Sequence, residues 1–287
     1  MNYQKEIYAF VFGERYRSIE DPISRHYHFK TEVAAVVFIG LHTFYAILYS
    51  LKMPFFEKYK IDPSPWPWEL ENWSELKWYL IKSLAFNHLV TYPVIQFSQV
   101  YFFHEMFVED DAQLPDHWTI VIHILFCMVV EDFYFYFAHR LLHWKPLYLW
   151  IHKIHHKFPH SISFLATSAH PLEVAFCFQA AFLMGPFLLC YVLNRPMHMY
   201  TGAIWILARI GESLDGHSGY EFSFSMWRLL PLSAGGYYHG FHHSHNTGNY
   251  ASFYILWDTF FGTNHEYYKY MQAVEEVQKK LEAKKSS

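Results

Sequence analysis

The sequence predicts an all-α integral membrane protein. Its composition is the first reason: 53% of the 287 residues are apolar and 21% are aromatic, whereas only 17% are charged. Soluble domains usually carry about 25% charged residues. The apolar residues also gather in long runs, which is the second reason. The net charge of −4 leaves no overall basic surface, so we expect no nucleic-acid partner.

The apolar runs give the order of the expected helices. They cover residues 31–51, 78–103, 118–138, 174–193 and 197–214. The first run is long enough to span a membrane, since about 20 residues cross a bilayer core. The second is interrupted by Lys82, His88 and Pro93. The sequence leaves open whether 118–138 spans the membrane or lies in its interface, because its direction depends on the two earlier runs.

The last two runs predict a helical hairpin, because only Asn194-Arg195-Pro196 separates them. A hairpin returns the chain to the membrane face that it left. The histidine clusters before and after it can therefore share one face. Lys153, Lys157 and the C-terminal lysines favour the cytosolic side for that face.

The chain has 21 histidines, and eight of them form three clusters. These are His139 and His143; His152, His155 and His156; and His239, His242 and His243. Residues three or four apart share one face of a helix, so each cluster presents converging imidazoles. Buried imidazoles repel one another when protonated and lose hydration when unpaired. A metal ion removes both costs, and imidazole is a ligand for iron, zinc, copper and nickel.

The number of ligands indicates two metal ions. Eight histidines are twice the set of a tetrahedral zinc site. Soluble di-iron bundles use glutamates and fewer histidines. A histidine-rich set leaves the metals more positive, which favours oxidation of an unreactive C–H bond over hydrolysis. The sequence therefore predicts a helical cap on the cytosolic face of the membrane helices, carrying a di-metal site.

Other residues are placed near this site by spacing. Asp132, Tyr136, His139 and His143 share one helical face, so we expect Asp132 to accept a hydrogen bond from a ligand imidazole. The alternative for Asp132 is a helix cap or a water-facing carboxylate. His217 is a candidate ninth ligand.

His170 is a candidate tenth ligand or a residue that orients one. Taken alone, spacing favours a structural role for both His170 and His217.

Two other classes of protein fit less well. A metal transporter would need polar residues in mid-span and often repeated halves, whereas these clusters flank the apolar runs and no repeat is visible. A haem protein with two axial histidines would leave most of the imidazoles unexplained.

The sequence resembles the fatty acid hydroxylase and sterol desaturase superfamily, and within it the C4-methylsterol monooxygenase family. The resemblance covers most of the chain. It rests on the motifs HRLLH (139–143), HKIHH (152–156), AHPLE (169–173), HSGY (217–220), HGFHH (239–243), GNYAS (248–252) and WDTFFGT (257–263).

The resemblance implies a non-haem di-iron monooxygenase that oxidises a sterol C4-methyl group stepwise with O2. It implies two iron ions per chain and electrons from NAD(P)H through cytochrome b5 and its reductase. Other sterol-demethylation enzymes are candidate partners. The implied ligands are His139, His143, His152, His155, His156, His217, His239, His242 and His243. A hydroxylase or desaturase of a fatty acyl, sphingoid or ether lipid is the alternative, and the complete ligand set argues against a silent relative.

The resemblance also implies a multi-pass protein of the endoplasmic reticulum, with its metal site and C-terminus in the cytosol. Lys284-Lys285-Ser286-Ser287 resembles the dilysine retrieval signal of that membrane, with a basic helix end as the alternative. The expected domains are 1–117 with two membrane helices, 118–265 with the catalytic site, and a charged helix and tail at 266–287. Thr167 and Gly240 depart from the family pattern and are expected near the substrate pocket.

Overall fold

The predicted all-α class is confirmed by the structure, a computed structural model that describes residues 6, 16, 18–109, 114–158 and 161–286. Within these residues the only sheet is a parallel pair of two-residue strands, β1 (Phe107–Val108) and β2 (Met197–His198). The last residue of the dilysine-like signal lies outside the described residues.

The helices of the first half include two of the three described segments that are long and apolar enough to cross a membrane. They are α2 (Pro22–Leu51), α3 (Pro54–Glu57), η1 (Pro67–Glu69), α4 (Trp73–Phe86), η2 (Asn87–Thr91), α5 (Tyr92–Phe103), η3 (His104–Met106) and α6 (His117–Leu142).

The helices of the second half complete the fold. They are α7 (Lys145–Trp150), η4 (His152–Lys157), η5 (Ser163–Thr167), α8 (Pro171–Glu173), η6 (Val174–Gln179), α9 (Ala180–Phe187), η7 (Leu188–Val192), α10 (Met199–Gly216), η8 (Met226–Arg228), α11 (Gly236–His245), α12 (Leu256–Phe261) and α13 (His265–Ser286).

Three helical segments of the described chain are long and apolar enough to cross a membrane: α2, α6, and the continuous stretch Pro171–Val192 from α8 to η7. Large apolar side chains on their outer faces are exposed, among them Val36 at 72% and Ile122 at 60%. An apolar surface of this extent is unusual on a soluble protein and is suited to lipid. The run 118–138 thus belongs to a helix of spanning length.

The first apolar helix begins at Pro22, earlier than the run at residue 31 suggested. Asp21 caps it, because its carboxylate accepts hydrogen bonds from the Ser24 amide and hydroxyl at 2.8 and 2.6 Å. Pro22 occupies the first turn, where its missing N–H costs nothing. The extra turns bring Lys30 into the protein interior, where only 9% of it is exposed.

The second apolar run forms α4 and α5, joined by the π-helical turn η2. Pro93 lies in the first turn of α5 and has no N–H to donate to the preceding turn. A π-turn adds one residue to the helical repeat and accommodates this gap. The run therefore stays helical through Pro93.

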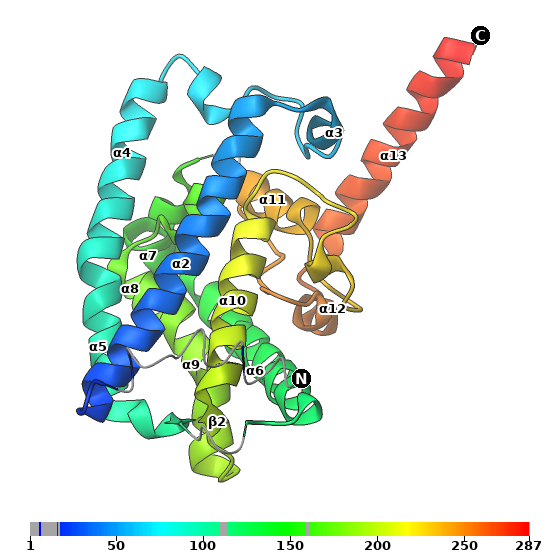
Figure 1. The fold of residues 1–287 in the computed structure, drawn as a ribbon. Coiled ribbons are helices and arrows are strands. Elements are labelled where there is room, and N and C mark those ends of the chain that lie inside the picture. Colours follow the sequence, from blue (N-terminus) through cyan, green and yellow to red (C-terminus); the bar gives the residue numbers. More distant parts are fainter. Residues whose placement is uncertain (1–5, 7–15, 17, 110–113, 159–160, 287) are drawn as a thin grey trace.

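Two helix pairs form the frame on which the site rests. α2 and α10 run side by side in the same direction (Figure 1), since Phe29 and Met199 share one core cluster and Tyr45 bonds Asp215 sixteen residues further along each helix. α6 packs against α9, with Cys127, Met128 and Phe182 in their shared core. α11 lies beside the C-terminal end of α10, α12 packs against α6, and α13 projects away from the bundle.

At Gly185 the backbone of α9 closely approaches the backbone of α6. A Cβ at Gly185 would lie 2.7 Å from Cys127 Cα, a backbone atom that cannot rotate away. We expect Gly185→Ala to lower the free energy of unfolding by roughly 1–3 kcal/mol through overpacking. Gly40→Ala is the matched control, because a Cβ there meets nothing within 4 Å. Ala should instead stabilise α2 by about 1 kcal/mol. Thermal unfolding in detergent measures both, and equal effects would contradict this packing.

Candidate metal centre

The structure brings together all nine histidines that the sequence and the resemblance singled out, in two groups. The five-histidine group is His139, His143, His152, His156 and His242. The four-histidine group is His155, His217, His239 and His243. Within each group one nitrogen of every ring lies within 4.8 Å of the others.

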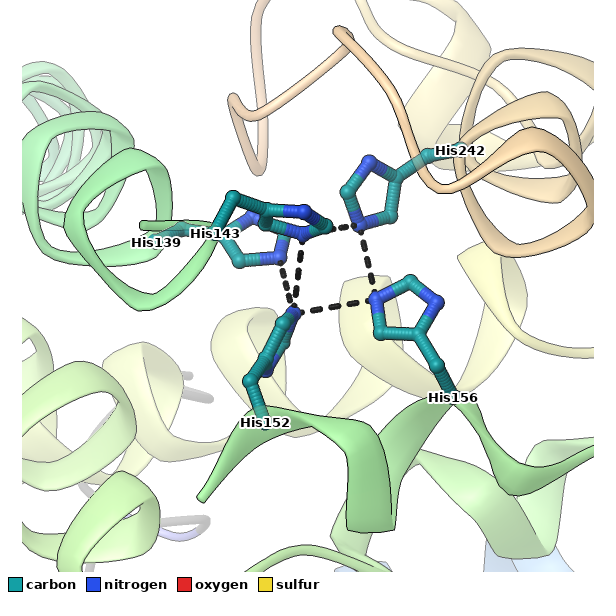
Figure 2. Close-up of side chains that lie close together, drawn as sticks. All are labelled: His139, His143, His152, His156 and His242. Atoms are coloured by element: carbon teal, nitrogen blue, oxygen red, sulfur yellow. Dashed lines mark hydrogen bonds between the residues drawn. The ribbon is translucent and has the colours of Figure 1, made fainter. Parts of the chain in front are cut away.

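The five-histidine group is assembled from α6, η4 and α11 (Figure 2). His152 Nε2 is its central atom, at 3.1 Å from His139 Nε2, 3.0 Å from His143 Nε2 and 2.9 Å from His156 Nε2. His242 Nε2 closes the ring, at 3.1 Å from His156 Nε2 and 3.2 Å from His143 Nε2.

The four-histidine group is assembled from η4, the C-terminus of α10 and α11. His239 Nε2 lies 2.8 Å from His217 Nε2 and 3.0 Å from His243 Nε2. His217 Nε2 lies 3.4 Å from His155 Nε2. His217, which the resemblance implied as a ligand, therefore lies inside this group.

The local structure of η4 decides how the histidines divide. His155 and His156 are neighbours in the sequence but belong to different groups, because consecutive residues of a helical segment point roughly 100–120° apart and the dihedrals at His156 are non-helical. The rings of His156 and His243 stack with centroids 4.6 Å apart, so the two groups share a wall. The two sites are adjacent halves of one centre.

Five of the nine imidazole rings are oriented by a hydrogen bond at Nδ1. The acceptors are Tyr250 O for His139 (2.9 Å), Glu173 Oε1 for His152 (2.9 Å), Ser168 O for His155 (3.3 Å), Ser213 O for His217 (2.7 Å) and Gly248 O for His242 (2.7 Å). Carbonyl and carboxylate oxygens only accept, so Nδ1 carries the proton in each ring. In a neutral imidazole the other nitrogen, Nε2, then presents a lone pair.

These lone pairs face each other. His139 and His152 are both held in this form, yet their Nε2 atoms lie 3.1 Å apart. His155 and His217 repeat the arrangement at 3.4 Å. Two acceptors at such distances repel unless a cation lies between them. The donor set thus fits a metal ion in each group, because neutral imidazole Nε2 is the commonest metal-binding nitrogen of proteins.

A proton is a poor substitute for that cation. Burial lowers the pKa of His155 to about 4 and of His143 to about 4. Burial, followed by the charge of His155, lowers the pKa of His217 to about 3. Burial and the neighbouring rings also hold the pKa values of His242 and His243 well below the usual range. At neutral pH these rings are uncharged and ready to bind metal.

A loop at 248–254 supplies two of the acceptors, the carbonyls of Gly248 and Tyr250. The expectation that Asp132 accepts a hydrogen bond from a ligand imidazole is wrong. Asp132 accepts bonds from the amides of Ser252, Phe253 and Tyr254, at 2.9, 2.7 and 3.1 Å, and the partner of His139 is the Tyr250 carbonyl. Asp132 is fully buried and lies in the interior of α6, so it is neither water-facing nor a cap of that helix. It fixes the loop whose Tyr250 carbonyl orients His139, so Asp132 acts on the ring only through this loop.

The same loop needs glycine at 248. Gly248 has φ +59°, and a Cβ there would lie 2.1 Å from Thr263 O. Asp258 holds the next turn by accepting from the Tyr250 and Ala251 amides at 2.9 and 2.8 Å. The motifs GNYAS and WDTFFGT thus build the carbonyl supports of the metal centre.

Glu173 is the supporting residue that spacing alone did not reveal. It is fully buried, and its carboxylate accepts from His152 Nδ1 at 2.9 Å. The AHPLE motif was the available signal. His170, expected to be a tenth ligand or to orient one, instead caps α8, since its Nδ1 accepts from the Leu172 amide at 3.1 Å. It lies outside both groups.

Two cavities meet beside the centre. A small metal-side cavity, with room for about one water, is walled by His139 and by three rings of the four-histidine group, His155, His217 and His239. A large apolar cavity of about 430 Å³ lies between α2, α5, η6 and α10. The two share the wall residues Ala166, Phe178, Arg209 and Ser213.

Of the two positions that depart from the family pattern, one lines the apolar cavity and the other does not. Thr167 lines the apolar cavity, as expected for a residue near the substrate. Gly240 is not among the residues that line this cavity. It lies on α11, where the nearest atom to a Cβ would be Ile61 Cγ2 at 3.9 Å.

Comparisons with known proteins agree with this geometry. A family profile described as "Fatty acid hydroxylase" matches residues 124–263. The methylsterol monooxygenase 1 of Gallus gallus is 35% identical over 82% of this chain and 75% of its own length. The chain belongs to the fatty acid hydroxylase family, together with the methylsterol monooxygenases. This confirms the resemblance read from the motifs.

Further relatives show the breadth of the family. A methylsterol monooxygenase of Aspergillus fumigatus is 33% identical over 73% of this chain and 69% of its own length. A protein of Oryza sativa subsp. indica named very-long-chain aldehyde decarbonylase is 35% identical over 69% of this chain and 72% of its own length. No solved structure matches the chain.

Removing the central ring of each group is expected to remove one metal ion. His152 and His239 each have neighbouring Nε2 atoms within 3.1 Å on two or more sides. We expect purified wild-type protein to hold two metal ions per chain, one for each group. His152→Ala or His239→Ala should hold about one. Elemental analysis measures the content.

His245→Ala is the matched control, because His245 lies on α11 but is exposed and stacks on Phe241 instead. It should retain both metal ions. Full metal content in the His152 and His239 variants would argue against two separate groups.

Replacing Glu173 is expected to weaken metal binding without removing a ligand. In Glu173→Gln an amide oxygen can still accept from His152, but the negative charge that makes this ring more basic is lost. We expect affinity to fall roughly 10- to 100-fold, as for other partners of metal-bound histidines. Competition with a chelator measures it. Glu57→Gln, which changes a carboxylate bonded to Tyr220 at 2.6 Å, should leave affinity unchanged. Equal affinities of all three proteins would contradict this role.

Proposed function

We propose that this chain oxidises a sterol C4-methyl group with O2 at a non-haem di-iron site. The observation that carries the proposal is the pair of histidine groups with inward-facing lone pairs, next to an apolar cavity of about 430 Å³. Small-molecule sites usually have about 300–1,000 Å³. All nine histidines lie between residues 139 and 243, inside the proposed catalytic domain 118–265. The methylsterol monooxygenases among the relatives support the substrate class.

The nine histidines are the proposed iron ligands, and Asp132 and Glu173 the proposed residues behind them. Two bound iron ions would supply the activation of O2 that an unactivated C–H bond requires. The protein's own groups hold the proton of each supported ring at Nδ1, which keeps Nε2 free. The apolar cavity binds a water-insoluble substrate between membrane helices and excludes water from its end near the metals.

The shape of the apolar cavity suits an elongated lipid. Its walls include Lys30 on α2, near the level of Met199 on α10, and Arg209 further along α10. About nine residues of helix separate these levels, which corresponds to roughly 13 Å. A fused ring system can therefore lie along α10 with one end beside the four-histidine group.

The proposed electron route runs from NAD(P)H through a reductase and cytochrome b5. Exposed cations adjoin the five-histidine group in the sequence: Arg140 follows His139, Lys153 follows His152, and Lys145 is two residues after His143. Such a rim would attract an acidic carrier. The proposed location is the endoplasmic reticulum membrane, with this rim, the metal site and α13 in the cytosol, where other sterol-demethylation enzymes are proposed to act beside it.

A second candidate function is oxidation of a long-chain acyl or alkyl lipid. It is favoured by the buried Lys30 at the far end of the apolar cavity, whose Nζ donates to Gln99 Oε1 at 2.7 Å. A carboxylate or headgroup could bind Lys30 while the chain extends to the metals. The rice relative named for very-long-chain aldehydes belongs to the same family.

Turnover in membranes separates the two functions. Membranes containing the chain, cytochrome b5 and its reductase receive NADH, O2 and either a 4,4-dimethylsterol or a long-chain fatty acid. The first function predicts a 4-hydroxymethyl sterol and later a 4-carboxylate, and the second predicts a hydroxylated chain. His155→Ala should abolish either product, because His155 is one of only four rings in its group. His245→Ala should retain activity. Sterol oxidation that survives His155→Ala would reject the proposed metal site.

A further inference from the structure

Arg209 occupies the junction between the two cavities. It lines both the metal-side cavity, together with His155, His217 and His239, and the apolar cavity. It lies on α10 two turns before His217. The other shared wall residues are Ala166, Phe178 and Ser213, so Arg209 is the one charged group at this junction among the described residues.

Two carboxylates hold the guanidinium of Arg209 in place. Nε donates to Glu131 Oε1 at 2.7 Å and Nη1 donates to Glu212 Oε2 at 3.0 Å. The group also lies over the rings of Phe135 and Phe253, at 5.5 and 5.4 Å from their centroids. Its side chain is only 12% exposed. A buried guanidinium with this many restraints is rigid.

These contacts leave donors of Arg209 unused. A guanidinium has five N–H groups, and the hydrogen bonds within the described chain use two of them. No Arg209 nitrogen is among the buried side-chain atoms of the described residues that lack a partner, so the unused N–H groups remain accessible where Arg209 lines the cavities. A simple structural ion pair would not need to lie in the walls of two cavities. The arrangement is suited to an oxygen atom of a molecule that enters the junction.

We propose that Arg209 is a substrate-binding residue that donates hydrogen bonds to the sterol C3 oxygen. This inference rests on the proposed function, since C4 carries the methyl group and the neighbouring ring carbon, C3, carries the oxygen. An oxygen bound at the junction places the C4 substituents beside the metal-side cavity. The apolar remainder of the sterol then extends along α10 towards Lys30. Arg209 thereby selects the carbon that is oxidised.

The second candidate function predicts the opposite orientation. A carboxylate at Lys30 would leave an alkyl chain at the junction, where Arg209 would have no oxygen to bind. Arg209 has two carboxylate partners and Lys30 has a neutral one, Gln99. The two candidate functions thus differ in which of these cations binds the oxygen of the substrate, and a substrate that lacks the C3 oxygen tests the role of Arg209.

The experiment compares a 4,4-dimethylsterol with its 3-deoxy analogue in the membrane assay described above. With wild-type protein we expect kcat/KM to be roughly 10- to 100-fold higher for the 3-hydroxy substrate, the value of one hydrogen bond to a charged group. In Arg209→Lys the charge is kept but the forked donor geometry is lost, so this ratio should fall to about a few-fold. Metal content shows that the variant retains its centre.

Two further variants guard against a general loss of folding. The double variant Arg209→Gln with Glu131→Gln removes the cation together with one of its counter-charges, so less unpaired charge is buried. Arg228→Lys is the matched control: Arg228 is 15% exposed and also pairs with two carboxylates, Asp215 and Glu221, but lines neither cavity. It should keep the wild-type ratio even if its stability falls.

The outcomes test the role of Arg209 separately from the proposed sterol oxidation. No oxidation of the 3-hydroxy sterol by wild-type protein would reject the proposed function. Oxidation of both sterols at equal kcat/KM would leave that function standing and overturn the role of Arg209. A wild-type ratio that persists in Arg209→Lys and in the double variant would also overturn it. A ratio lost in these variants and kept in Arg228→Lys would support it.

Discussion

The metal centre depends on one constraint: an imidazole whose Nδ1 donates to a fixed acceptor must present a lone pair at Nε2. Five of the nine rings are held in this way, four of them by the backbone carbonyls of Ser213, Ser168, Gly248 and Tyr250. The lone pairs converge in an interior where protonation is costly. The site can therefore reach its lowest free energy only with cations bound.

The fold can be understood as the means of keeping these acceptors still. The carboxylates of Asp132 and Asp258 accept hydrogen bonds from five backbone amides of one loop. These bonds keep the carbonyls of Gly248 and Tyr250 in place. The tight contact of α9 with α6 at Gly185 fixes the helix that carries His139. The parallel pair α2 and α10 then places an apolar cavity directly beside the four-histidine group. A rigid set of histidines and space for a lipid thus come from neighbouring elements.

Much of this could be predicted from the sequence, because periodic spacing reports directly on helices. The apolar runs predicted the all-α class, and the histidine spacings marked the residues that converge. The division into two groups could not be predicted, since it depends on the local backbone of η4, where the dihedrals at His156 are non-helical. Helical spacing also placed Asp132 on the face of His139, but a backbone carbonyl from residue 250 occupies the intervening position. Every residue has a backbone carbonyl, so the residue type does not show which carbonyl accepts a hydrogen bond from a ligand.

The five-histidine group joins three distant parts of the chain: α6, η4 and α11. A ligand that binds only the folded state stabilises that state in proportion to the logarithm of its concentration. The same ion that makes the centre reactive would therefore also cross-link the polypeptide. In a cell short of that ion, more of the chain would open and meet the proteases that clear unfolded protein. The amount of protein in the membrane would then follow the supply of metal without any separate regulator.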